Sequence, residues 1–156
     1  MKRVTVKGEL DRLTEQEGAL WGGFLRSHAL LTRTLDTQLR TAHGLSLSSY
    51  EVLLKVAWAP EARVRMSDLA EKCLLSPGGV TRIVHVLVDD GLVTRQVPPQ
   101  NRRVVLVEIT DKGFALLQAA QRTHLAGVRT HFLRHFDDLE AAMVARAWKA
   151  IQLQGD

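Results

Sequence analysis

One segment in the middle of the chain constrains the fold most strongly, because it predicts a capped helix that leads directly into a basic β-hairpin. Ser76 is a favoured N-cap residue, and Pro77 stands at the first helical position, where its missing N–H group costs nothing. Gly91 suits the left-handed position that ends a helix. Such a unit fits a helix into one groove of DNA and a charged tip into the next. The segment therefore favours DNA binding over catalysis.

The predicted helix has two unlike faces. Its apolar residues recur at helical spacing and predict the buried side: Val80, Ile83, Val84 and Leu87. At its start, Ser76, Gly78 and Gly79 are expected to place backbone N–H groups on a phosphate. The other side carries the side chains that we expect to reach base edges: Thr81, Arg82 and His85. The alternative is an ordinary surface helix with a loose start, since glycines are poor helix formers.

Two runs of β-branched residues, 92–97 and 104–109, predict the paired strands of the hairpin. Pro98 and Pro99 end the first run because neither can donate a ladder hydrogen bond. The tip that remains contains Asn101, Arg102 and Arg103. Two adjacent arginines at a hairpin tip are usually a solvated turn, but beside a helix that faces phosphate they fit backbone clamping and minor-groove insertion. Helix and hairpin together predict a winged helix.

Two shorter helices are predicted before this one, as a helix-turn-helix requires. Residues 48–51 have the pattern of a capping box that opens a helix to about residue 57. Ser67 can cap a short helix over residues 67–72. Between these two helices, residues 63–66 predict a short strand beside the wing.

The two ends of the chain predict long amphipathic helices with surplus apolar surface. One helix spans roughly residues 16–42, and a second begins after Thr110 and reaches about His135. Asp137 or Asp138 caps a last helix. These helices carry more apolar side chains than a winged helix needs for its own core. A two-fold dimer would bury the surplus, and a monomeric helix bundle is the alternative.

The charge balance agrees with nucleic acid as a partner. The net charge is +4, and residues 63–104 hold seven Lys or Arg against four Asp or Glu, so the expected DNA-facing region is basic. No Ser-His-Asp arrangement, phosphate loop or carboxylate pair stands out in the sequence. We therefore expect no enzyme and no cofactor. The sequence shows no signal peptide or membrane-spanning segment, so we expect a cytoplasmic protein without membrane contact.

Two features could suggest a metal or redox site. His124, His131 and His135 share a helical spacing, but no acidic or cysteine partner lies nearby in the sequence, so no metal site is expected. The single cysteine, Cys73, excludes an internal disulfide and is expected to be a packed apolar residue. Its position between two predicted DNA-binding helices leaves a redox role as the alternative.

The order and spacing of five motifs resemble the MarR family, the multiple-antibiotic-resistance-type regulators of bacteria. The motifs are Arg-Met-Ser-Asp-Leu-Ala at 65–70, Leu-Ser-Pro-Gly-Gly-Val-Thr-Arg at 75–82, Asp-Gly-Leu-Val at 90–93, Arg-Arg at 102–103 and Ile-Thr-Asp-Lys-Gly at 109–113. With the flanking helices the resemblance covers nearly the whole chain. It implies a homodimer in which each subunit places residues 76–88 in the major groove and one wing arginine, Arg103, in the minor groove.

One residue departs from the family pattern. The family usually has an aspartate two residues before the wing arginine, and Asn101 stands there in this chain. Asparagine can accept a hydrogen bond from a guanidinium but supplies no counter-charge. The wing is therefore expected to be oriented less firmly than is usual in the family.

The resemblance also implies a small-molecule effector. Many members of the family lose DNA affinity when a small aromatic or phenolic acid binds between the dimer helices and the winged helix. Trp21 and His28 lie on one face of the first predicted helix and could line such a pocket. Trp21 resembles the tryptophan that urate-responsive members carry in their first helix. The alternative is that a tryptophan at this spacing belongs to the core.

We therefore predict a mainly α fold with a small β-hairpin wing, that is, a winged helix-turn-helix with N- and C-terminal dimerisation helices. A single domain spans residues 1–156, with dimerisation helices at 16–45 and 114–156 and the DNA-binding region at 46–113. The predicted function is that of a sequence-specific repressor that binds double-stranded DNA as a homodimer and is released by a small ligand. The alternatives are a winged-helix protein-interaction module and a ligand-insensitive DNA-binding protein.

Overall fold

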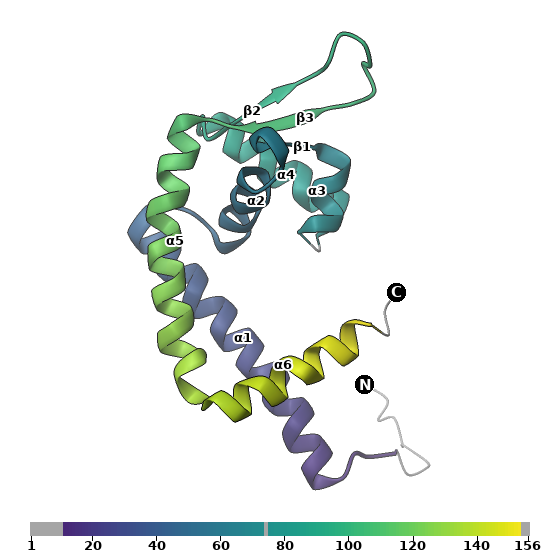
Figure 1. Cartoon of the computed structure of the whole chain (residues 1–156), viewed down its shortest axis with the longest axis vertical. Coiled ribbons are helices and arrows are strands. Elements are labelled where there is room, and N and C mark those ends of the chain that lie inside the picture. The colour runs from purple at the N-terminus through teal and green to yellow at the C-terminus, as the bar shows by residue number, and fades with distance from the viewer. Residues whose placement is uncertain (1–10, 74, 154–156) are drawn as a thin grey trace, which may run out of the picture.

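The computed structural model describes residues 11–73 and 75–153. The elements follow in the order α1 (Glu15–His43), α2 (Leu47–Ala57), the 3₁₀ helix η1 (Pro60–Ala62), β1 (Arg63–Arg65), α3 (Met66–Lys72), α4 (Pro77–Asp89), β2 (Val93–Gln96), β3 (Leu106–Ile109), α5 (Asp111–His131), the 3₁₀ helix η2 (Leu133–His135) and α6 (Asp138–Gln152). Figure 1 shows the shorter elements gathered at one end and the long helices α1 and α5, with α6, extending away from them. The predicted mainly α fold with a small β wing is confirmed.

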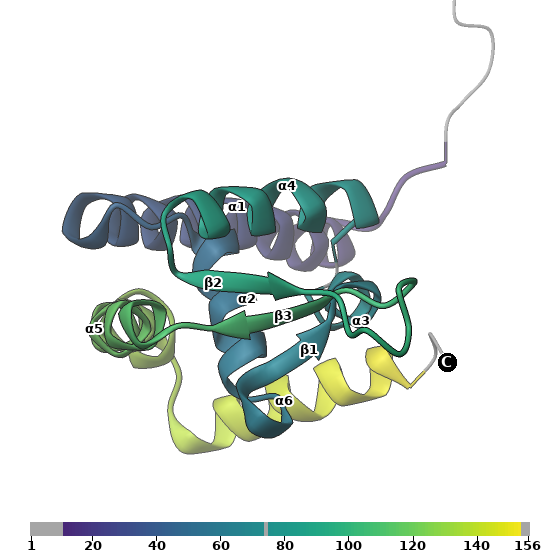
Figure 2. The ribbon, with the colours of Figure 1, turned by 90° about the horizontal axis from the view of Figure 1, so that it is seen from above.

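The wing is part of a three-stranded antiparallel sheet with the strand order β1-β3-β2. In β3, Val107 lies opposite Val64 of β1 and opposite Arg95 of β2. The paired strands are shorter than the runs predicted from the sequence, because Val105 instead accepts a hydrogen bond from the N–H of Met66 at 2.9 Å. Figure 2 shows α4 running along the β2 side of the sheet. Helix α4 and the wing are thereby held beside each other.

The hydrophobic core lies in the winged-helix part of the molecule. Every buried hydrophobic residue among those described falls between Leu39 and Ala120. Leu53 of α2, Val84 of α4 and Val107 of β3 are each 0% exposed and belong to the same cluster. Because burial of apolar surface stabilises by roughly 25 cal/mol per Å², this cluster fixes the position of α4 on the sheet.

The N-termini of the last three α-helices agree with the predicted caps. Ser76, Thr110 and Asp137 are the N-caps of α4, α5 and α6. Each side chain accepts a hydrogen bond from a backbone N–H group in the first turn. These starts need only local residues, which explains why the sequence predicts them.

The predicted starts of α2 and α3 are wrong by one or two residues. The capping box at residues 48–51 does not form, because α2 begins at Leu47, whose N–H donates to Asp36 of α1 at 2.9 Å. Its N-cap is Ser46, which accepts from the N–H of Ser49 at 3.0 Å.

Helix α3 begins at Met66 without a side-chain cap, since the Met66 N–H donates to the wing strand, and Ser67 donates to Asp68 instead. The start of α3 is therefore set by a tertiary hydrogen bond, whereas the start of α2 combines a local cap with a tertiary hydrogen bond to α1.

Helix α5 ends earlier than predicted. It stops at His131, and the residues up to His135 form η2. Phe132 has non-helical backbone angles at this point (φ −127°, ψ −66°), and its ring packs on Phe136 with 5.1 Å between the ring centroids. This aromatic contact turns the chain toward α6 and separates His131 from His135.

The junction between α4 and α5 is closely packed. Gly91 ends α4 with a φ of +68°, and the Thr110 hydroxyl donates to its carbonyl at 2.8 Å. Lys112 donates to the carbonyl of Asp90 at 2.6 Å, so a side chain from α5 satisfies a carbonyl that the helix end leaves free. A Cβ on Gly113 would overlap the carbonyl oxygen of Leu92, so only glycine fits there. The end of α4 is thus held against the start of α5 by hydrogen bonds.

Helices α1 and α5 pack against each other along the long axis of the molecule (Figure 1). At Gly127 of α5 a Cβ would overlap the side chains of Gln38 and Leu35, so side chains of α1 pack directly on the α5 backbone there. Helix α6, in contrast, contains no buried residue. Among the described residues, none of the helices is both long enough and apolar enough to span a bilayer.

Candidate nucleic-acid interface

The N-terminus of α4 is open to a ligand that accepts hydrogen bonds. The Ser76 hydroxyl accepts from the N–H of Gly79 at 3.1 Å, which fixes the first turn. A Cβ on Gly78 would meet no atom of the described residues within 4 Å. Packing within the chain therefore does not require a glycine at position 78. A phosphate that comes close to the backbone would require one, because a side chain there would be in its way. Pro77 is the first residue of the helix, as predicted.

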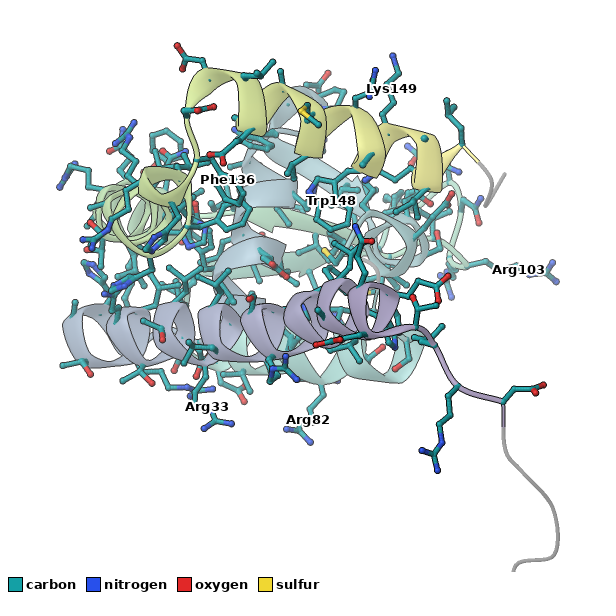
Figure 3. All side chains as sticks on the ribbon, turned by 90° about the horizontal axis from the view of Figure 1, so that it is seen from below. Arg33, Arg82, Arg103, Phe136, Trp148 and Lys149 are labelled. Atoms are coloured by element: carbon teal, nitrogen blue, oxygen red, sulfur yellow. The ribbon has the colours of Figure 1, made fainter. Side chains whose placement is uncertain are left out.

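The two faces of α4 differ in burial as the sequence predicts. Val80, Val84 and Leu87 are buried, and Ile83 is half-buried. Thr81, Arg82 and His85 are all exposed on the other side. Figure 3 shows Arg82 projecting away from the body of the molecule. Their contact with DNA stays a prediction, but all three side chains are exposed to a molecule that approaches this face.

The wing tip is held by a network of backbone hydrogen bonds around Asn101. The Asn101 N–H donates to the carbonyl of Pro98 at 3.0 Å, and the Val104 N–H donates to the carbonyl of Asn101 at 3.1 Å. The side-chain oxygen of Asn101 accepts from the backbone N–H of Arg103 at 3.1 Å. The sequence suggested a guanidinium as the donor to Asn101, but here the side chain orders the backbone of the turn, which is a common role of asparagine.

The arginines of this surface keep their charges available. Arg82, Arg102 and Arg103 are exposed, and within the described part of the chain they take part in no ion pair. The ion pairs that form there are Arg40 with Asp36 and Arg63 with Glu61. Figure 3 shows Arg103 extending outward from the wing. Unpaired guanidinium groups suit phosphate and base contacts because they lose no intrachain partner on binding.

A contact between α4 and the wing was not predicted. Nη1 of Arg95, on β2, lies 3.3 Å from Nε2 of His85. Both side chains are exposed. The two residues lie ten positions apart, and only the packing of α4 along β2 brings them together. Alternation along the strand indicates which face Arg95 occupies, but no sequence signal identifies its partner.

Trp21 and His28 do not line a described cavity; they flank Phe24. The ring centroids of Trp21 and Phe24 lie 5.8 Å apart, and those of Phe24 and His28 lie 6.2 Å apart. Trp148 of α6 packs on Phe24 at 5.3 Å. These four rings form a cluster that joins α1 to α6 on an open face of the molecule.

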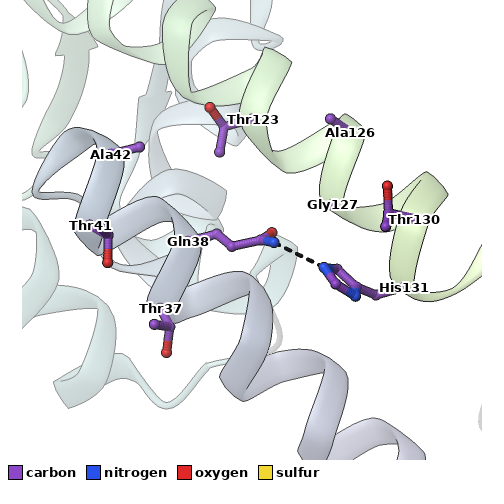
Figure 4. Close-up of a pocket in the computed structure, with 9 residues that line it drawn as sticks. All are labelled: Thr37, Gln38, Thr41, Ala42, Thr123, Ala126, Gly127, Thr130 and His131. Carbon is purple, nitrogen blue, oxygen red and sulfur yellow. Dashed lines mark hydrogen bonds between the residues drawn. The ribbon is translucent and has the colours of Figure 1, made fainter.

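A cavity of about 460 Å³ lies farther along α1 and faces α5 (Figure 4). Small and uncharged polar residues line it: Thr37, Gln38, Thr41, Ala42, Thr123, Ala126, Gly127, Thr130 and His131. Gln38 and His131 share a hydrogen bond of 2.9 Å across its floor (Figure 4). The cavity is therefore separate from Trp21 and His28.

The cysteine and histidines do not form a reactive site. Cys73 is buried in the core, and this burial raises the pKa of its thiol, so the reactive thiolate is disfavoured. His131 bonds to Gln38, and the ring of His124 packs on Tyr50 with 4.6 Å between centroids. Burial lowers the pKa of His124. Across the residues with described positions, no cluster of three or more potential metal ligands occurs.

Comparisons with known proteins agree with this architecture. Residues 43–104 match the model of the MarR family. The chain is 30% identical over 86 residues to the HTH-type transcriptional regulator MhqR of Bacillus subtilis (strain 168), and the match covers 55% of this chain and 58% of MhqR. It is 23% identical over 103 residues to the HTH-type transcriptional repressor YetL of the same organism, covering 66% of this chain and 61% of YetL. The chain thus spans less than two thirds of the length of these relatives.

Solved structures extend the similarity to the long helices α1, α5 and α6. AbsC, a MarR family transcriptional regulator from Streptomyces coelicolor, is 28% identical and superposes with a TM-score of 0.87 over 94% of this chain and 100% of AbsC. Sco3205, a MarR family regulator from the same organism in complex with DNA, is 24% identical and shares the fold with a TM-score of 0.87 over 93% of this chain and 94% of its own. The proteins of this family are transcriptional regulators and not enzymes. Residues 43–104 thus match the MarR family, and the chain shares its winged helix-turn-helix fold with MarR family regulators.

Proposed function

We propose that this chain is a sequence-specific transcriptional repressor that binds double-stranded DNA as a homodimer. The observation that carries the proposal is the division of α4 into a face buried on the core and an exposed face that bears Thr81, Arg82 and His85. A rigid helix with polar side chains on its free face is what the major groove of B-DNA admits.

In this proposal the start of α4 is held on a phosphate, and its exposed face reads bases. Ser76, Pro77, Gly78 and Gly79 form the open N-terminal end of the helix, where the helix dipole favours an anion. Arg82 is suited to guanine, since its guanidinium can donate to both O6 and N7. Thr81 and His85 would contact neighbouring bases.

The wing would contact the adjacent minor groove. Arg103 is the residue proposed to enter it, and Arg102 and Asn101 would hold the wing on the phosphate backbone. The Asn101 side chain fixes the backbone N–H of Arg103, which limits the directions that its side chain can take. A narrow minor groove has an enhanced negative potential, so Arg103 would favour sites with A·T-rich flanks.

A second copy of the chain is proposed to cover the apolar faces of the long helices. Leu20 of α1 and Leu139 of α6 are 78% and 70% exposed, and Trp148 joins these helices through its contact with Phe24. Contiguous apolar surface of this kind marks an interaction site in a soluble protein. A two-fold dimer would place two α4 helices on half-sites about 10 base pairs apart, which predicts a pseudo-palindromic operator.

Repression would follow from occupancy of the operator, and we propose that the protein acts in the cytoplasm, where the chromosome lies. The relative YetL is described as a repressor. Release would require a small ligand that prefers the conformation that does not bind DNA; a shift from 1:99 to 99:1 needs about 5.5 kcal/mol of preference. Trp21 and His28 are the residues proposed to contact it, because both rings border an exposed aromatic cluster.

Selection of bound duplexes from a randomised DNA pool tests the proposal. At physiological salt, the purified protein is expected to enrich a palindrome whose half-sites are spaced by one turn of the duplex. A folded, dimeric sample that enriches no sequence would contradict it. A single enriched half-site without its symmetric partner would contradict the dimer while leaving DNA binding in place.

The role of the wing can be tested separately with Arg103→Ala. Because Arg103 is proposed to enter the minor groove, the variant should lose most affinity at sites with A·T-rich flanks. The matched variant Arg102→Ala removes the same charge from the neighbouring position and should weaken binding to all flanks alike. Equal losses for Arg103→Ala on A·T-rich and G·C-rich flanks would contradict minor-groove insertion.

A further inference from the structure

The contact between Arg95 and His85 restricts the chemistry of the recognition helix. The two residues come from different elements, β2 and α4, and their Nη1 and Nε2 atoms are 3.3 Å apart. On the same strand, Gln96 donates to Glu108 at 2.9 Å, so that carboxylate has a partner of its own. Arg95 lies opposite the buried Val107, on the face of the sheet that meets α4. Its guanidinium is thus directed at His85.

The chemistry of the two groups determines where the imidazole hydrogen is. A guanidinium has only donors, so Nε2 of His85 must accept with its lone pair. The ring in this contact is therefore neutral and carries its hydrogen on Nδ1. In free neutral histidine the hydrogen is mostly on Nε2, so the contact favours the less common tautomer. The edge of His85 left for another partner is then a hydrogen-bond donor.

We propose that Arg95 is a positioning residue that sets the base preference of His85 by holding its imidazole in the Nδ1–H tautomer. The inference rests on the proposed insertion of α4 into the major groove. A donor at Nδ1 fits the acceptors O6 and N7 of guanine, O4 of thymine and N7 of adenine. The opposite tautomer would offer an acceptor, which fits the amino groups of cytosine and adenine. Arg95 thereby acts on specificity without touching a base.

The tautomer can be measured in the protein without DNA. Long-range ¹H–¹⁵N spectra of the histidine rings distinguish a protonated from an unprotonated ring nitrogen, and His85→Asn identifies the signals of His85. In the wild type we expect Nε2 to be unprotonated and Nδ1 to carry the hydrogen. Arg95→Met removes the donor and should return the ring mainly to the Nε2–H form, whereas Arg95→Lys keeps a donor and should retain the Nδ1–H form. A ring that is already Nε2–H in the wild type would overturn the inference.

Selection from randomised DNA then tests the consequence for specificity. The wild type and Arg95→Lys should prefer guanine or thymine at the base pair that His85 faces, and Arg95→Met should lose this preference by roughly threefold to tenfold, the effect of one hydrogen bond. Arg102→Met also removes one cation but should leave the preference unchanged. If Arg95→Met weakens binding to every sequence alike, Arg95 acts only through its charge and the inference is overturned, although the proposed function stands. Failure of the wild type to enrich any sequence would overturn both.

Discussion

The winged-helix region and the long helices α1, α5 and α6, which we call the arms, differ in how much of their apolar surface is buried within a single chain. In the winged helix, α2, α4 and β3 share a core in which Leu53, Val84 and Val107 are fully buried. In the arms, α6 has no buried residue and large apolar side chains of α1 remain exposed. Helices α1 and α5 pack on each other, but the apolar face of α6 finds little cover within the chain.

The difference suggests a division of roles. The part proposed to read DNA has its own packed core, and the part proposed to set the distance between two reading helices would be completed by a second chain in the proposed dimer. The two parts are joined at a rigid junction, where Thr110 and Lys112 of the α5 start bond to the carbonyls at the end of α4. A change in the arms would therefore be transmitted to the recognition helix.

The largest expected effect is on the free energy of unfolding, which should respond differently to substitutions in the two regions. Leu53→Ala should lower the free energy of unfolding by about 2–5 kcal/mol, because it leaves a cavity in a fully packed core. Denaturant unfolding at several protein concentrations measures this loss, which should be nearly the same at each concentration. Leu139→Ala is the matched control in the arm; its cost should appear mainly at concentrations where the dimer forms. Equal and concentration-independent losses would show that the arm packs within one chain.

The next prediction concerns the interface between chains. Trp148→Ala removes an aromatic ring that joins α6 to α1 and should weaken dimerisation by about 2 kcal/mol or more, as for a buried interface tryptophan. Sedimentation equilibrium measures the dissociation constant. Lys149→Ala is the control, since Lys149 points away from the molecule while Trp148 points inward (Figure 3). A dimer as strong in Trp148→Ala as in the wild type would place the interface elsewhere.

A third test addresses the reading surface of the winged helix. Arg82→Ala should cost roughly 1–3 kcal/mol of binding free energy and relax the preference at one base pair in each half-site. Arg33→Ala removes an exposed arginine from α1 and should leave that preference unchanged. Competition binding with single-base variants of the selected operator separates the two. Uniform weakening across all variants by Arg82→Ala would make Arg82 a phosphate contact.

The smallest expected effect is a pH dependence of stability that arises at the contact of His124 on α5 with Tyr50 on α2. Burial lowers the pKa of His124, so below about pH 6.5 the unfolded chain binds more protons than the folded chain. The contribution to stability is complete above that pH and is lost as the pH falls toward the folded-state pKa. His124→Phe keeps a ring on Tyr50 but cannot titrate. The stability of His124→Phe relative to the wild type should therefore rise from about pH 7 to pH 5, and a constant difference would contradict the prediction.

Local signals predicted some of this structure well, because they act within one helical turn. Ser76, Thr110 and Asp137 cap their helices through hydrogen bonds to nearby N–H groups. The buried stripe of α4 follows from residue spacing alone. The starts of α2 and α3 were wrong for a different reason. Each start involves a partner distant in the sequence, Asp36 for α2 and Val105 for α3, and α2 has the local cap Ser46 in addition.

The candidate site divides in the same way. Its arginines and glycines stand in the sequence as a motif, but the pairing of Arg95 with His85 depends on how α4 lies along β2. The contact of Asn101 with a backbone N–H, in place of a guanidinium, depends on the shape of the turn. The Arg95–His85 contact joins two elements, which residue spacing does not specify, whereas the Asn101 contact is local to the wing turn.

The sequence by itself determined the kinds of element, the caps of α4, α5 and α6, and the exposed polar face of α4, since periodicity and capping are properties of neighbouring residues. Only the tertiary structure decided which apolar surface remains uncovered, how α5 is joined to α4, and that Arg95 lies beside His85. The physical reason is that burial and hydrogen-bond partners belong to pairs of groups, and the pairing is known only once the elements are packed.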